Sequence, residues 1–423
     1  MKYKSKDDLK KNLQAFIDEG LLAKKSRPQK YWYPLSCATY EIEEIMEAVE
    51  SLCMFVTTMG DKTLRFEKTF SEKFNHSESI FVNSGSSADL LIAFALVNPA
   101  ANLLEPGDEI LAPSVTWPTQ IWSPMMAGLK VRLVDTDPFT LNMDIKDLEI
   151  KIGPRTRAIS LVHLMGNPCE MDKITEICQK HDLVLVEDCC ESLGAKYKGQ
   201  SVGTFGIAGS YSFFFSHHIT TMEGGMVGCR DKGLSDLFRL LRAHGWARNM
   251  KHTYIKPANG IDERYTFINW GFNLRPTELQ AGFGLVQLGR QPEFHKQRKK
   301  NAEYFGSYLL KYKDIMRLMQ VSDNAECSWF ALPVMLTPEC PFSKENFLKY
   351  LEKMGVETRP IVTGNIALQP VVNMFPSLKD DNLHGANMIH KSGFYLGLYP
   401  FDSTEQMDRL FEIFDSYLKD YIK

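Results

Sequence analysis

The first residues of the chain carry apolar side chains at the spacing of one helix face. In residues 6–25 these side chains recur every three or four positions, and lysines occupy much of the opposite face. Arg27 and Pro28 interrupt the pattern, and Thr39 stands where the N-cap of a second helix is expected. We therefore expect an N-terminal helical extension over residues 1–35.

From about residue 80, short apolar runs alternate with amphipathic stretches. The run over residues 183–187 is almost continuously apolar, which is typical of a strand buried on both faces. An alternation of strands and helices predicts a mostly parallel sheet covered by helices. The predicted strands are 80–83, 109–113, 130–135, 158–164, 183–187, 211–215 and 225–229, and the predicted helices are 88–96, 119–126 and 173–181.

The pattern changes after about residue 285. It predicts a long basic helix over 293–312, a strand within 329–336, and amphipathic helices at 344–354 and 405–418. We expect a large domain over residues 36–290 and a smaller C-terminal α/β domain over 291–423. Within the long helix, Arg298, Lys299 and Lys300 are typical of a solvated face.

Composition narrows the classes of function. The 423 residues are 44% hydrophobic and carry a net charge of −3, which favours a globular protein and neither nucleic acid nor a polybasic membrane anchor as partner. The longest apolar run, 90–97, is too short to cross a membrane, and the charged N-terminus lacks the apolar core of a signal peptide. We expect a cytoplasmic protein.

Nine cysteines are present, and none forms a CxxC pair. An odd number at this spacing fits neither a disulfide framework nor a zinc knuckle. We expect reduced thiols and no metal site.

Several residues could carry chemistry, each with a plainer alternative. The run Ser84–Ala88 opens a helix after a strand, so it could bind a phosphate or simply form the turn. Asp188 ends a strand and could hold a ligand or cap the next turn. Trp117 could stack on a flat ring or belong to the core. His217 and His218 could be surface or structural histidines that bind no metal. On extended backbone they would point to opposite sides, so at most one would serve a given site as acid or base.

Taken together, longer runs resemble the pyridoxal-phosphate-dependent sugar aminotransferase family (DegT/DnrJ/EryC1/StrS), of fold type I. The resemblance implies an α/β fold in which a large domain with a mostly parallel seven-stranded sheet precedes a smaller C-terminal α/β domain. The matching runs are SGSSADLL at 84–91, PGDEILAPSVTWPT at 106–119, LVEDCCESLGA at 185–195, GTFGIAGSYSFFFSHH at 203–218, EGGMV at 223–227 and NLRPTELQAGFGLVQL at 273–288.

One position departs from that family. Its members have a Schiff-base lysine five residues after the serine at 212, where this chain has His217, and no lysine lies between 199 and 231. An imidazole cannot form the Schiff base but can move a proton. Two branches of the family share this change, and both remove the C3 hydroxyl of a nucleotide-linked 4-keto-6-deoxyhexose.

One of these branches also holds an iron–sulfur cluster that a reductase serves. Its cluster cysteines fall in the segment that corresponds to residues 245–273, and this chain has no cysteine there. The chain is therefore more similar to the cluster-free branch, which needs no iron–sulfur reductase. The runs RAHGWARN at 242–249, RKKNAEYF at 298–305, SWF at 328–330 and TRPIVTGN at 358–365 carry this closer resemblance.

The resemblance also implies roles for single residues. His217 would be the catalytic acid/base and Asp188 would hold the pyridine nitrogen of pyridoxal or pyridoxamine phosphate. Cys189 and Cys190 would only pack beneath the site. The other implied cofactor contacts are Trp117 on the ring face, Glu191 at the ring hydroxyl, Ser86, Ser87 and Ser212 at the phosphate, and Asn273 from the second subunit of a homodimer, while Arg248 and His244 would bind the amino donor.

The implied reaction converts GDP-4-keto-6-deoxy-D-mannose to its 3-deoxy product, with L-glutamate as donor and ammonia released. Guanosine rests on the resemblance alone, so a CDP- or dTDP-linked sugar stays an alternative. A nucleotide-sugar aminotransferase is a second alternative, and an inactive binding or regulatory homologue is a third.

Overall fold

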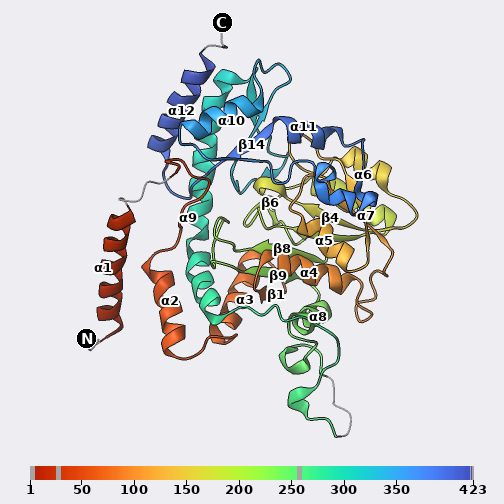
Figure 1. The fold of residues 1–423 in the computed structure, drawn as a ribbon. Coiled ribbons are helices and arrows are strands. Elements are labelled where there is room, and N and C mark those ends of the chain that lie inside the picture. Colours follow the sequence, from red (N-terminus) through yellow and green to blue (C-terminus); the bar gives the residue numbers. More distant parts are fainter. Residues whose placement is uncertain (1–4, 25–29, 255–259, 420, 422–423) are drawn as a thin grey trace.

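A seven-stranded sheet lies at the centre of the computed structural model, which describes residues 5–24, 30–254, 260–419 and 421 (Figure 1). Its strands are β1 (Glu78–Val82), β2 (Glu109–Pro113), β3 (Lys130–Val134), β4 (Thr156–Val162), β5 (Val184–Asp188), β8 (Ala208–Ser212) and β9 (Gly225–Cys229). Their order is β1-β9-β8-β5-β4-β2-β3, with antiparallel pairing only where β9 meets β1 and β8. The predicted fold of a mostly parallel seven-stranded sheet is confirmed.

Helices surround this sheet, and α4 packs against β8 and β9. The helices are α1 (Lys6–Lys24), α2 (Ile42–Cys53), α3 (Asp61–Phe74), α4 (Gly85–Leu96), α5 (Thr119–Met126), α6 (Ile145–Lys151), α7 (Met171–His181), α8 (Lys232–Arg242), α9 (Glu278–Leu309), α10 (Lys344–Lys353), α11 (His384–Ser392) and α12 (Thr404–Leu418). Short 3₁₀ helices occupy Leu164–Gly166, Ala247–Asn249, Glu263–Tyr265, Leu310–Tyr312, Ile366–Leu368, Pro370–Asn373 and Pro376–Leu378.

The long helix α9 runs beside α2 and α3 and continues to α12 (Figure 1). Thr277 and Gln280 form a capping box at its first turn, so the start expected at residue 293 was wrong. Glycines in the first half of α9 weaken the helical signal there. Gly284 is required because an added Cβ would lie 2.5 Å from the ring of Phe66, which is fully buried.

A second, antiparallel sheet occupies the C-terminal part of the chain. It consists of β10 (Met316–Leu318), β12 (Leu332–Leu336), β14 (Gly393–Leu396) and β13 (Thr358–Pro360), in that order. A small third sheet consists of β11 (Ala325–Glu326), β6 (Lys196–Tyr197) and β7 (Gln200–Ser201), in that order. Because α9 runs across residue 290, the domain division at that residue stays a prediction.

The N-terminal part of the chain contacts the neighbouring helix α2 and the C-terminal part of the chain. Lys10 of α1 pairs with Glu43 of α2 at 2.9 Å. Tyr33 pairs with Val356 in a β-bridge, and its hydroxyl donates to the carbonyl of Gly397 at 3.0 Å. Residues 25–29, where the sequence predicts the end of the first helix, lie outside the described residues.

Two further elements differ from the bounds that the sequence predicts. The second helix begins at Ile42 with a capping box of Glu41 and Glu44, whereas Thr39 contacts α9 instead of capping the helix. The strand expected at 211–215 is β8, three residues earlier, because its small residues obscure the strand signal. Among the described residues, no helix is long and apolar enough to cross a membrane.

Candidate active site

The N-terminus of α4 forms one wall of the candidate site. Ser84 caps the helix by accepting from the Ser87 amide at 3.1 Å, and the Ser87 hydroxyl donates to Asn83 at 2.6 Å. The Ser86 side chain is exposed beyond them. Gly85 lies so close to Ser212 that an added Cβ would be 2.6 Å from the Cβ of that serine. Free amides at a helix N-terminus with hydroxyls beside them form an anion site.

Asp188 ends β5 and is buried beneath this helix. Its Oδ1 accepts from the Cys190 amide at 2.8 Å, and its Oδ2 accepts from the side-chain amide of Gln120 at 2.8 Å. The Ser160 hydroxyl donates to the other end of Gln120 at 2.6 Å and so orients its amide. Burial raises the pKa of Asp188. A partner cation would stabilise the charged carboxylate, and a protonated ring nitrogen is such a partner.

His217 follows β8 and lines a cavity of about 360 Å³. Its imidazole meets the ring of Phe330 edge to face, with centroids 5.1 Å apart. Nδ1 is buried and has no hydrogen-bond partner within the described part of the chain. Burial and then the charge of Arg298 lower the pKa of His217 to about 3, so the ring is neutral.

The neighbouring His218 does not line this cavity. Its Nε2 contacts the backbone carbonyl of Ser328 at 3.1 Å, and the residue is buried. As expected, only one of the two histidines lines the cavity, although they lie in a turn after β8 and not on extended backbone.

Two arginines beside His217 were not predicted from the sequence as residues of the site. Arg298 was expected on a solvated face, but it is buried and donates to the carbonyls of Phe330 and Leu398, each at 2.9 Å. That expectation was wrong because backbone carbonyls from distant segments surround its guanidinium. Arg359 lines the same cavity and contacts Glu357 at 3.2 Å. Arg359 lies on β13, and no pattern in the sequence indicates that it lines this cavity.

Trp117 and Glu191 lie outside the His217 cavity. Trp117 precedes α5 and is 58% exposed, which leaves its ring face open for stacking and excludes the core alternative. Glu191 accepts from the Met165 amide at 3.0 Å, and burial raises its pKa to about 7.

Three predicted residues lie apart from His217 in this chain. His244 and Arg248 follow α8 in a segment that extends away from α9, and both are exposed (Figure 1). Arg248 stacks on Trp246 with its guanidinium carbon 5.3 Å from the ring centroid. Asn273 is also exposed and accepts from Arg275 at 2.9 Å. The structure of one chain does not bring these three residues to the His217 cavity.

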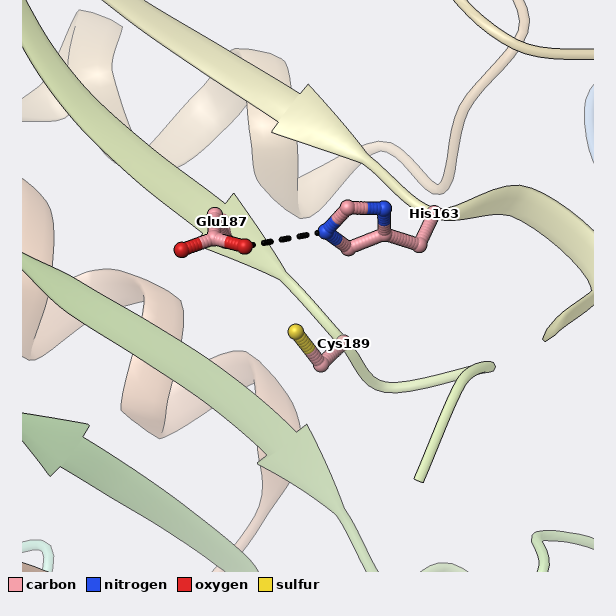
Figure 2. Close-up of side chains that lie close together, drawn as sticks. All are labelled: His163, Glu187 and Cys189. Carbon is pink, nitrogen blue, oxygen red and sulfur yellow. Dashed lines mark hydrogen bonds and ion pairs between the residues drawn. The ribbon is translucent and has the colours of Figure 1, made fainter. Parts of the chain in front are cut away.

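A buried cluster beside the site looks like a metal centre but is a hydrogen-bond hub. Figure 2 shows His163, Glu187 and Cys189, whose ligand atoms lie within 4.8 Å of one another. Glu187 accepts from the amides of Gly203, Phe205 and Gly206 at 2.7–2.8 Å and from His163 Nε2 at 3.0 Å. The other ring nitrogen of His163 accepts from the Cys169 amide at 3.0 Å. All four lone-pair positions of the carboxylate are occupied, so none is left for a metal.

The cysteines beside the site are free thiols. Cys189 is fully buried and Cys190 is half-buried, and burial raises the pKa of both. This agrees with a packing role beneath the site rather than a reactive one.

Comparison with known proteins agrees with this geometry. The sequence profile of the DegT/DnrJ/EryC1/StrS aminotransferase family matches residues 39–415. The chain belongs to this family. It is 37% identical over 390 residues to a GDP-4-keto-6-deoxy-D-mannose 3-dehydratase of Yersinia pseudotuberculosis, a match that covers 90% of this chain and 98% of the relative.

Solved structures of the family have the same fold. The GDP-4-keto-6-deoxy-D-mannose-3-dehydratase of E. coli with bound hydrated pyridoxal phosphate superposes with a TM-score of 0.86 at 34% identity, over 90% of this chain and 99% of that one. A GDP-4-keto-6-deoxymannose-3-dehydratase with a trapped PLP–glutamate geminal diamine superposes with a TM-score of 0.84 at 34% identity, with the same coverage. The fold is therefore that of a type I pyridoxal-phosphate enzyme.

Proposed function

We propose that this protein is a 3-dehydratase that removes the C3 hydroxyl of GDP-4-keto-6-deoxy-D-mannose. Pyridoxal or pyridoxamine phosphate is its cofactor and L-glutamate its amino donor. The observation that carries the proposal is the buried imidazole of His217, which lines a cavity of about 360 Å³. The resemblance puts the family's lysine at this sequence position. The relatives named 3-dehydratases support the substrate and the cofactor.

The residues present fit the cofactor. The N-terminus of α4 with Ser86 and Ser212 suits its phosphate, because the absence of a side chain at Gly85 lets Ser212 at the end of β8 lie beside the helix N-terminus. Ser87 supports this turn through Asn83. When bound, the cofactor supplies an electron sink in its protonated pyridine ring.

The chain's own residues hold and move protons around that ring. Asp188 keeps the proton on the pyridine nitrogen, since Gln120 and the Cys190 amide hold it in place and favour its anionic form. Trp117 covers the ring face, and Glu191 accepts from the ring hydroxyl. His217 lacks an amine, so it forms no covalent bond and instead accepts and returns a proton at its Nε2 atom.

The electron balance requires an amino donor. Glutamate is oxidised to 2-oxoglutarate with release of ammonia, and the sugar loses one oxygen atom at C3, so no outside reductase takes part. The donor carboxylate needs a guanidinium, which Arg248 supplies from a neighbouring subunit with His244 beside it. Arg359 is the guanidinium that this chain places in the cavity itself.

A homodimer belongs to the proposal. Asn273, His244 and Arg248 are exposed, and one segment carries all three. The same segment carries exposed aromatic side chains, which a second subunit would bury. They are Tyr254, Tyr265, Phe267 and Trp270. A cytoplasmic location is also part of the proposal, because all nine cysteines are free.

Borohydride trapping tests the chemistry against the aminotransferase alternative. The protein is mixed with pyridoxal phosphate, reduced with borohydride and examined by peptide mass spectrometry. We expect no lysine of the wild-type protein to carry the cofactor, whereas the matched variant His217→Lys carries it at residue 217. A modified lysine in the wild-type protein would favour ordinary transamination.

A further inference from the structure

A second carboxyl group lies beside Asp188. Asp89, in the second turn of α4, is 7% exposed and accepts from the Thr119 hydroxyl at 2.9 Å. Ligand atoms of Asp89, Asp188 and Cys190 all lie within 4.8 Å of one another. Within the described residues, no lysine, arginine or histidine nitrogen comes within 4.0 Å of Asp89. The two carboxyls therefore share a buried space without a basic side chain paired to Asp89.

Two carboxylates this close in a buried space cannot both stay charged, so the pair binds a proton that exposed aspartates would release. The hydrogen bonds decide which member holds it. Asp188 accepts from two N–H groups, each at 2.8 Å, whereas Asp89 accepts from the Thr119 hydroxyl at 2.9 Å, with the Ser210 hydroxyl and Gln120 nearby. Because N–H donors stabilise the charged form of Asp188, the shared proton resides on Asp89. Burial and then the charge of Asp188 raise the pKa of Asp89, in agreement.

The surroundings of the pair favour a proton over a metal ion. Both oxygens of Asp188 already accept N–H bonds. A cavity of about 20 Å³ lies between Asp89, Asp188 and Ser210, which is room for one water molecule. The Ser210 hydroxyl is buried and has no partner in the described part of the chain. A protonated carboxyl of Asp89 can donate a hydrogen bond to Asp188 or to a water molecule in this cavity.

We propose that Asp89 is a positioning residue that retains one proton beside Asp188 and so leaves Asp188 as the anion that faces the pyridine nitrogen. The cofactor part of this inference rests on the proposed function. The protonation of Asp89 does not rest on the proposed function, because it follows from the closeness of the two carboxyl groups and from their hydrogen bonds.

Carbon-13 NMR of the cofactor-free protein, labelled at the aspartate carboxyl carbons, tests the proton directly. Burial raises the pKa of both members of the pair, so we expect the aspartate that titrates highest in the wild-type protein to be the one whose signal vanishes in Asp89→Asn. In Asp188→Asn the same signal should titrate about two pH units lower, because a neutral neighbour replaces a charge. Thr119→Val, which removes a donor to the charged form, should shift it upward.

An Asp89 that titrates near pH 4, or one that Asp188→Asn leaves unchanged, would overturn the proposal. Because Thr119→Val leaves both carboxyls in place, its upward shift still assigns the raised signal to Asp89 if an aspartate variant fails to fold, and the absence of any shift would contradict that assignment.

Cofactor binding tests the consequence. Asparagine resembles a protonated aspartic acid, so Asp89→Asn should keep the affinity for pyridoxal phosphate within about threefold and leave the absorbance of the protonated ring unchanged. Asp89→Leu, which cannot hydrogen-bond, should weaken binding at least about tenfold. A tenfold loss in Asp89→Asn would show that Asp89 acts as an anion and refute the inference. If the wild-type protein itself binds no cofactor, the proposed function fails while the NMR result stands.

Discussion

Replacing Glu187 by glutamine should destabilise the protein far more than its small chemical change indicates. The carboxylate accepts four hydrogen bonds in a fully buried position, three from backbone amides of the 203–206 turn and one from His163 (Figure 2). A glutamine offers one acceptor oxygen and one NH₂ group. In one orientation the NH₂ group faces the amides of Phe205 and Gly206, and in the other it faces Gly203 and His163.

Either orientation leaves two buried donors without an acceptor. Each such donor costs about 1–3 kcal/mol, so the expected loss is about 4 kcal/mol. His163 cannot compensate by changing its tautomer, because its Nδ1 already accepts from the Cys169 amide. A loss of this size is a large share of the roughly 5–15 kcal/mol that stabilises a typical domain.

Urea unfolding followed by circular dichroism measures the loss. The matched control is Glu303→Gln, which alters an exposed pair with Lys299 and should cost less than about 0.5 kcal/mol. A loss below about 1 kcal/mol for Glu187→Gln would refute the hydrogen-bond count. It would also reopen the alternative of a metal site at the cluster with His163.

Three smaller effects should follow from other buried contacts. Burial lowers the pKa of His76 to about 4 from an ordinary 6.5, so its contribution is complete above pH 6.5. As the pH falls towards 4, urea unfolding should show wild-type stability dropping by about 1.4 kcal/mol per pH unit more than in His76→Gln. Gly284→Ala forces a Cβ to within 2.5 Å of Phe66 and should cost about 1–3 kcal/mol, whereas Gly289→Ala, with open space around it, should be neutral or stabilising. Asp135→Ala removes the acceptor of two amides at the start of α11 and should lower stability by about 1–2 kcal/mol in thermal unfolding.

Elements with a strong local pattern could be predicted from the sequence. The apolar run of β2 and the helix α5 have the predicted bounds, 109–113 and 119–126, because turn residues flank both. The start of α9 could not be found, since its need for Gly284 arises from Phe66, more than two hundred residues away. Helix propensity counts that glycine as a cost, and only the packing shows why it is there.

The same limit applies to the candidate site. The serine turn and Asp188 carry local signals, because both follow strands at the sheet edge where ligands gather. Arg298 carries a misleading signal, since two lysines follow it and its buried carbonyl partners lie 32 and 100 residues away. Asp89 gives no signal in the sequence, because a single aspartate in an apolar helix indicates no function until the fold brings Asp188 beside it.

The central claim is that this chain removes a hydroxyl group through a histidine where its family uses a lysine. The most direct test incubates the protein with pyridoxal phosphate, L-glutamate and GDP-4-keto-6-deoxy-D-mannose, and measures the product mass and the ammonia released. We predict a nucleotide sugar lighter by one oxygen atom and one ammonia per product, with the rate reduced about 10²–10⁴-fold in His217→Asn. An aminated sugar without free ammonia, or no turnover of GDP-, CDP- or dTDP-linked substrates, would contradict the claim.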